Sequence, residues 1–161
     1  MFGFGYFISN LYWITNSLTF EENFKTLIPF ALVLIPLFLG FFYGVVTLIC
    51  SFFTLNKKFS SILIISTFFS LIEFIRGFIL GGFPWNLFAF AWTDYLSILQ
   101  VLSFIGTYSF NLLILTIFLI PAIILFDYKK KTKMIFLIST VSILLGNFFY
   151  GSAILKSNEK V

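Results

Sequence analysis

The residues best suited to chemistry lie near the middle of the chain, where two opposite charges precede a glycine, proline and tryptophan turn. Glu73 and Arg76 are three positions apart, so on a helix they share one face and can pair. A guanidinium binds phosphate oxygens through two parallel hydrogen bonds, which suits Arg76 to a phospholipid head group with Glu73 orienting it. A purely structural ion pair at the end of a helix fits the same spacing, so both interpretations stay open.

The turn that follows, Gly81-Gly82-Phe83-Pro84-Trp85, predicts the end of a helix. Glycine tolerates a positive φ, Pro84 cannot continue a helix, and Phe83 and Trp85 supply rigid apolar surface. Irregular backbone at membrane depth survives only where protein or a water-filled cavity covers it. We therefore expect this corner to line a pocket, with a simple helix-breaking interfacial loop as the alternative.

The composition shows which elements must position these residues. Of 161 residues, 60% are hydrophobic and only 10% are charged, whereas soluble domains are about half apolar and a quarter charged. The composition predicts an all-α, polytopic membrane helix bundle. The formal charge of +4 does not indicate nucleic-acid binding, because the lysines form short clusters between apolar runs.

The inventory of reactive side chains is thin. The chain has no histidine, which removes the commonest general base and metal ligand, so we predict no metal site, no cofactor and no catalytic residue in it. The single cysteine, Cys50, lies in an apolar run without a basic neighbour and is expected to be a buried, inert thiol. Asp94 follows Trp92 and is expected to be a solvated loop carboxylate.

Membrane spans follow from the length of the uncharged stretches, since a bilayer core of about 30 Å requires about 20 helical residues. We predict a single transmembrane domain over residues 1–161 with about five spans, over residues 2–18, 27–55, 60–79, 96–126 and 134–155. Four glycines in the first two spans, at positions 3, 5, 40 and 44, are expected to mark close helix packing.

The lysines orient these spans, because basic loops stay cytoplasmic. One basic loop holds Lys57 and Lys58, and the other holds lysines at positions 129, 130, 131 and 133. Both loops fall on one side if five spans alternate. This predicts a cytoplasmic N-terminus and a periplasmic C-terminus, with the Pro84-Trp85 corner on the periplasmic side.

The motifs together resemble a known family. Glu73-Phe74-Ile75-Arg76-Gly77 followed by Gly82-Phe83-Pro84-Trp85 is similar to the E-x-x-R-G and G-F-P-W signature of apolipoprotein N-acyltransferases. The opening residues 3–14 look like the third membrane helix of that family, and residues 99–111 look like the start of its sixth. These elements occur in the family's order and roughly its spacing.

The resemblance implies a function. The family transfers an acyl chain from a phospholipid donor to the N-terminal diacylglyceryl-cysteine of a bacterial lipoprotein, in the inner (cytoplasmic) membrane. Its Glu-Lys-Cys triad belongs to a nitrilase-like domain, which we expect to lie outside this chain or to be encoded separately. What the resemblance carries over here is a substrate-binding wall of Glu73, Arg76, Phe83, Pro84 and Trp85.

A second hypothesis from another class stays open. The chain could serve as a non-enzymatic membrane protein that binds lipid or acts as a scaffold, as the product of a split or decayed gene. We therefore expect the isolated chain to be inactive under either hypothesis.

Overall fold

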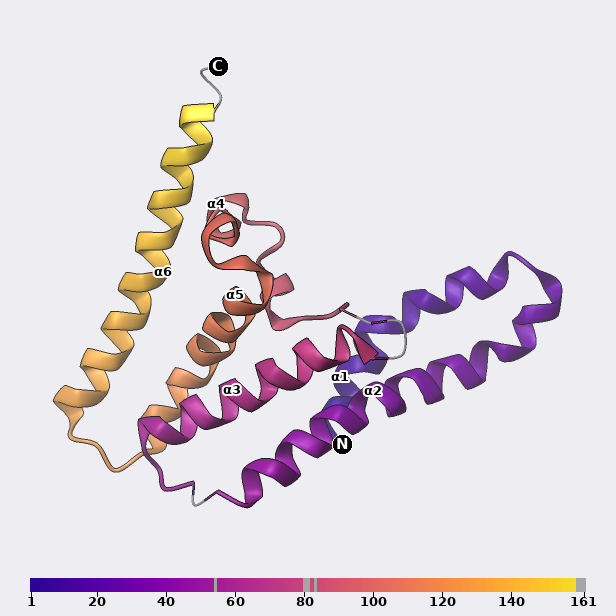
Figure 1. Cartoon of the computed structure of the whole chain (residues 1–161), viewed down its shortest axis with the longest axis horizontal. Helices are drawn as coiled ribbons and strands as arrows, with labels where there is room; N and C mark the ends of the chain where they lie inside the picture. Colours follow the sequence, from indigo (N-terminus) through magenta and orange to yellow (C-terminus); the bar gives the residue numbers. More distant parts are fainter. Residues whose placement is uncertain (54, 80–81, 83, 159–161) are drawn as a thin grey trace. The chain divides into compact units, whose positions relative to one another are not determined.

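The computed structural model describes residues 1–53, 55–79, 82 and 84–158, and over these residues the secondary structure is helical and contains no strand (Figure 1). Phe83 lies outside the described residues. The elements are α1 (Phe2–Leu11), η1 (Tyr12–Thr19), η2 (Glu22–Leu27), α2 (Ile28–Ser51), α3 (Phe59–Arg76), η4 (Phe88–Trp92), α4 (Leu96–Leu99), α5 (Leu102–Leu119), η5 (Ile120–Leu125) and α6 (Lys130–Asn158), where η marks a 3-10 helix.

The predicted all-α membrane bundle is confirmed. Four helical segments of the described chain are long and apolar enough to cross a membrane: Glu22–Ser51, Phe59–Arg76, Leu102–Leu125 and Lys130–Ser157. Their apolar side chains are exposed along much of their length, as expected where lipid is the solvent.

The first predicted span, residues 2–18, is divided between a 10-residue α-helix and an 8-residue 3-10 helix. Neither alone has the length of a span, so a membrane crossing by this region stays a prediction. The predicted span 96–126 is also divided. Gly106, with φ 73° and ψ 168°, interrupts the helix after its first turn, a conformation that glycine adopts at little cost.

The chain forms two compact units, Met1–Phe53 and Thr54–Val161. In the first unit α1 packs against α2 where two glycines meet. A Cβ on Gly40 would lie 2.8 Å from the backbone nitrogen of Phe4, and one on Gly3 would lie 3.0 Å from Gly40. The packing prediction is therefore correct for this pair. It is wrong for Gly5 and Gly44, around which there is open space.

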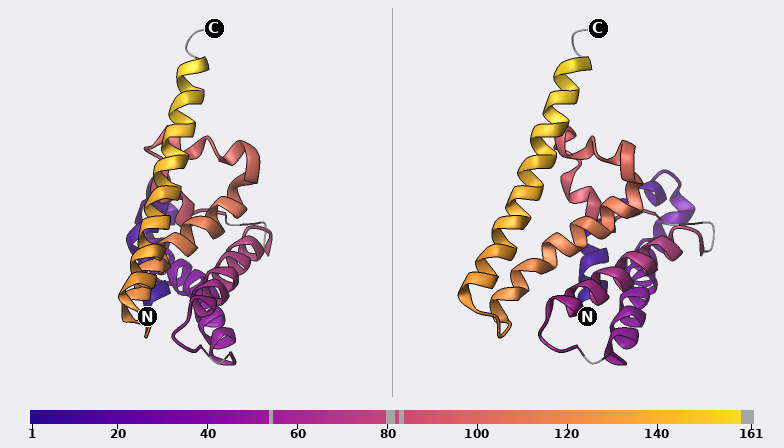
Figure 2. Two further views of the ribbon diagram at one scale, coloured as in Figure 1. Left: turned by 90° about the vertical axis from the view of Figure 1, so that its left-hand side faces the viewer. Right: turned by 60° about the vertical axis from the view of Figure 1, so that its left-hand side comes forward.

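In the second unit α3 packs against α5, and α4 packs against α6 (Figures 1 and 2). The segment that joins α3 to α4 contains η4, which packs on α5. A core shared by η4, α4 and α5 is formed by Leu87, Ala89, Ile98, Phe110, Ile114 and Ile117. This core holds the segment after α3 against α4 and α5.

Candidate functional site

The buried face of α3 carries polar side chains at helical spacing. Ser66, Ser70 and Glu73 recur at intervals of four and three residues, so they lie on one face, and all three are buried. Small hydroxyl-bearing residues let two membrane helices approach closely and hydrogen-bond across the contact. Here the hydroxyl of Ser66 accepts a hydrogen bond from Thr116 of α5 at 3.0 Å.

Glu73 takes part in a chain of buried hydrogen bonds that joins α3, α5 and η4. Its side chain is fully buried, and its Oε2 accepts a hydrogen bond of 2.5 Å from Nδ2 of Asn111 on α5. The amide oxygen of Asn111 in turn accepts the backbone N–H of Ala89 in η4 at 2.9 Å. One buried asparagine therefore ties α3 to η4 through α5, and both faces of its amide are used.

Arg76 connects the same pair to the corner. Its Nη2 lies 3.9 Å from Oε1 of Glu73, at the limit of an ion pair, and donates a closer hydrogen bond of 3.0 Å to the carbonyl oxygen of Trp85. Arg76 is only 2% exposed. In this conformation the guanidinium donates a hydrogen bond to the backbone of the corner and is buried in the protein interior.

Within the corner, the described residue Gly82 has the backbone conformation that glycine favours. Gly82 has φ +79°, in the region that glycine tolerates, and its N–H is bonded to the carbonyl of Ile79 at 2.9 Å. Asn86 also has a positive φ, of 58°, which asparagine adopts more readily than most residues. Pro84 is exposed and Trp85 is 54% exposed, whereas Arg76 and Leu87 on either side of them in sequence are buried.

Pro84 and Trp85 line a cavity of about 270 Å³, together with Leu87, Phe90, Thr107 and Tyr108. The first four of these residues are apolar, and the last two carry hydroxyl groups. Gly77, directly after Arg76, makes room for Tyr108: a Cβ at this position would collide with the Tyr108 hydroxyl. The cavity is suited to an amphipathic molecule, with hydrocarbon against the rings and an oxygen-bearing group near the hydroxyls.

The structure brings together four of the five predicted site residues in two ways. Glu73 and Arg76 are buried behind the corner, and Pro84 and Trp85 form its cavity surface. Sequence reasoning missed Asn111 and Tyr108. The signal available for Asn111 was a lone amide in a long apolar run, because a polar side chain within a membrane span needs a buried partner.

The remaining candidates lie apart from this site. Cys50 is buried in α2 as a free thiol, and Asp94 is exposed in the turn after η4, as predicted for both. Among the described residues no group of three or more acidic or cysteine side chains gathers as metal ligands would.

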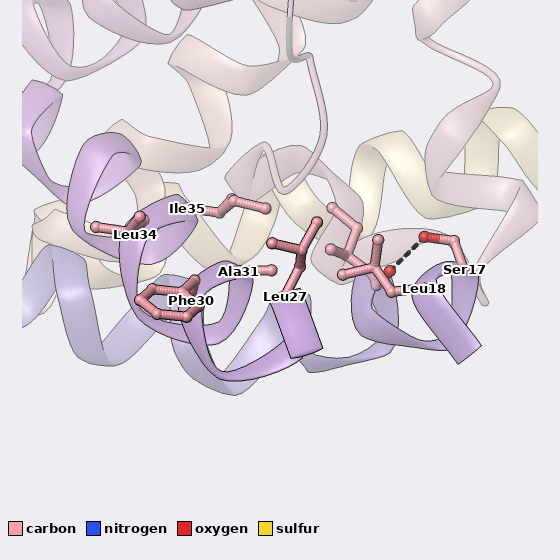
Figure 3. A pocket seen from close by; sticks show the side chains of 8 residues that line it. Ser17, Leu18, Leu27, Phe30, Ala31, Leu34 and Ile35 are labelled. Atoms are coloured by element: carbon pink, nitrogen blue, oxygen red, sulfur yellow. Dashed lines mark hydrogen bonds between the residues drawn. The ribbon is translucent and has the colours of Figure 1, made fainter. Parts of the chain in front are cut away.

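A second cavity, of about 460 Å³, lies within the first unit between η1 and the start of α2 (Figure 3). Its lining is apolar apart from Ser17, whose hydroxyl donates to the carbonyl of Ile14 at 2.6 Å. The other residues that line it are Ile14, Leu18, Leu27, Phe30, Ala31, Leu34 and Ile35. Because its one polar group is already bonded within its own helix, this cavity is suited to hydrocarbon alone.

Comparison with known proteins gives a consistent result. The model of the apolipoprotein N-acyltransferase N-terminal domain matches residues 1–120. The apolipoprotein N-acyltransferase of Rickettsia prowazekii is 35% identical over 159 residues, covering 98% of this chain and 32% of the relative. That of Sinorhizobium medicae is 30% identical over 150 residues, covering 92% of this chain and 28% of the relative.

This chain thus spans about a third of the length of these curated relatives. No solved structure matches it.

Proposed function

The chain belongs to the apolipoprotein N-acyltransferase family. From this we propose that it forms the membrane-embedded part that surrounds the lipid substrates of such an enzyme. The proposed reaction moves an acyl chain from a phospholipid to the amino group of the diacylglyceryl-cysteine at the N-terminus of a lipoprotein. The reacting groups in this proposal come from a nitrilase-like domain outside these residues. The proposed location is the bacterial inner membrane, with a cytoplasmic N-terminus and a periplasmic C-terminus.

The observation that carries the proposal is the cavity lined by Pro84 and Trp85. It combines apolar surface with the hydroxyl-bearing Thr107 and Tyr108, as binding of an acyl ester requires. In the proposed topology this corner lies on the same side as the nitrilase-like domain. An acyl chain held against Trp85 would present its ester at the membrane surface, where that domain acts.

Within this proposal the five predicted residues have two roles. Pro84 and Trp85, with Phe83 beside them in sequence, touch the acyl chain. Glu73 and Arg76 act as positioning residues, because Arg76 donates to the carbonyl of Trp85 and Glu73 is joined to Asn111. Direct contact of Arg76 with a head group stays a prediction that requires its side chain to leave this buried position.

The test replaces Trp85 by alanine. Membranes that contain this chain together with the nitrilase-like domain of the proposal are assayed for N-acylation of a diacylated lipopeptide. We expect kcat/KM to fall about tenfold, equivalent to about 1.4 kcal/mol, because a ring that contacts hydrocarbon is removed. Trp13→Ala is the matched control, since Trp13 is also exposed but belongs to the first unit. Unchanged kinetics for Trp85→Ala would remove the assignment of this cavity to substrate.

The non-enzymatic alternative gives a different result in the same membranes. If the chain only binds lipid or serves as a scaffold, no acylated product forms in membranes with the unaltered chain, and no nitrilase-like protein co-purifies with it.

A further inference from the structure

Most of the positive charge of this protein lies in two short segments of the second unit, the loop before α3 and the start of α6 with the residue before it. Six of its ten lysine and arginine residues occur between positions 57 and 58 and between positions 129 and 133, separated by about 70 positions of sequence. The same two segments contain no acidic residue, and Asp127 is the only one nearby in sequence. The preference of basic loops for the cytoplasm explains lysines in each loop separately, but it does not require the two loops to meet.

The fold joins these two loops. The backbone N–H of Phe59, the first residue of α3, donates a 3.0 Å hydrogen bond to the hydroxyl of Tyr128, just before α6. In Figure 1 the start of α3 and the connection between η5 and α6 accordingly lie at the same end of the second unit. Lys58 and Lys129 each adjoin one partner of this hydrogen bond in sequence, so it brings the two lysine clusters to one place.

Ring contacts hold the same two segments together. The ring of Phe59 stacks on that of Phe136 with centroids 4.9 Å apart, and the ring of Tyr128 lies 6.1 Å from Phe136. These rings pack against a buried core of Ile62, Ile120 and Ile123. Since the hydrogen bond and the ring contacts already hold the two segments together, a ligand that binds here does not have to order their backbone.

The lysine side chains are available to a ligand. Those at positions 57, 58, 129, 130 and 131 are exposed. Lys133 is half-buried, and its ammonium donates a hydrogen bond of 2.7 Å to the carbonyl of Ile124 in the last turn of η5. Five exposed lysines thus lie close in sequence to the joined residues Phe59 and Tyr128, at one end of the apolar helices α3 and α6. The end of a membrane helix is where lipid phosphates are found.

We call the five exposed lysines, at positions 57, 58, 129, 130 and 131, the lysine junction. We propose that the lysine junction binds the phosphate head group of an anionic glycerophospholipid, with phosphatidylglycerol as the simplest example. Clustered lysines next to membrane helices attract anionic lipids, and helices beside them provide apolar surface for the acyl chains. This site is distinct from the cavity at Trp85 and does not depend on the proposed acyl transfer. Its ligand serves here as a bound structural lipid rather than as a reactant.

The experiment uses the full chain in non-ionic detergent with equal amounts of phosphatidylglycerol and phosphatidylcholine, and native mass spectrometry counts the bound lipids. We expect a preference for phosphatidylglycerol that weakens as salt rises from about 50 to about 500 mM, because screening shortens the reach of exposed charges. Each lysine near an anionic lipid contributes about fivefold in association constant. The variants K57Q/K58Q and K129Q/K130Q/K131Q should therefore each lose at least fivefold of the preference.

Two controls make the test specific. Lys25→Gln removes an exposed lysine in the first unit and should leave the preference unchanged. Tyr128→Phe keeps every charge but removes the hydroxyl that joins the loops, so it should lower the preference about twofold or more. A preference that survives in both multiple-lysine variants would overturn the proposal. So would displacement of the lipid by an equal concentration of inorganic phosphate, since that would indicate a site for free anions.

Discussion

Replacing Asn111 by alanine is the most informative perturbation of the second unit. The Asn111 side chain is fully buried, donates to the carboxylate of Glu73 at 2.5 Å, and accepts the backbone N–H of Ala89 at 2.9 Å. Alanine has neither a donor nor an acceptor in its side chain. The substitution therefore leaves a buried carboxylate and a buried backbone N–H in need of other partners.

The magnitude follows from these two losses. A hydrogen bond to a charged group contributes about 1.5–3 kcal/mol, and an unsatisfied buried donor costs about 1–3 kcal/mol. Polar contacts between membrane helices measure lower, at about 0.6 kcal/mol on average and at most about 1.7, because the unfolded chain in a membrane also finds partners. Both partners of Asn111 are buried and one of them is a carboxylate, so we take each of the two losses near this maximum. We therefore expect Asn111→Ala to lower the free energy of unfolding by about 3 kcal/mol.

The assay is reversible unfolding of the full chain in bicelles, followed by circular dichroism. Thr116→Val is the matched control on the same helix, since it removes a neutral hydrogen bond to Ser66 across the same helix pair and should cost about 0.6 kcal/mol. If the cost of Asn111→Ala were within about 0.5 kcal/mol of that for Thr116→Val, Asn111 would not be the link between α3 and η4 that the geometry indicates.

Two further predictions concern the neighbours of this link. Arg76→Leu should lower the free energy of unfolding by about 3–5 kcal/mol, because it leaves the buried carboxylate of Glu73 without its cation. The double variant Glu73→Leu/Arg76→Leu should cost less than Arg76→Leu alone. Equal costs in the same unfolding assay would contradict a buried charge pair. Gly77→Ala should lower the free energy of unfolding by about 1–3 kcal/mol, because the added Cβ collides with the Tyr108 hydroxyl. Adding Tyr108→Phe should recover most of this loss. No recovery in thermal unfolding would show that the strain lies elsewhere.

The regular helices could be predicted from the sequence because each depends on a local property. Long uncharged runs required α2, α3 and α6, and the glycine and proline after Arg76 ended α3 close to where the structure ends it. The break at Gly106 was not predicted. A glycine in an apolar run is compatible with an unbroken helix, so the run by itself does not show that Gly106 takes a positive φ.

The candidate site was predictable only in part. The charged pair and the corner stood out because charge and proline are rare in membrane helices. Their relation to each other was not visible: the spacing of Glu73 and Arg76 favoured an ion pair, while in the folded protein Arg76 lies closer to the carbonyl of Trp85. Asn111 and Tyr108 had no local signal strong enough to join them to the site.

The sequence by itself determined that this is an all-α membrane protein of the apolipoprotein N-acyltransferase family, because composition and motif order do not depend on how the helices pack. Only the tertiary structure decided which distant residues meet. Asn111 bonds to Glu73 across 38 positions, and Tyr128 bonds to Phe59 across 69. Such contacts depend on the three-dimensional course of the backbone, since a buried polar group bonds with whatever partner the fold brings within about 3 Å, however far away that partner lies in the sequence.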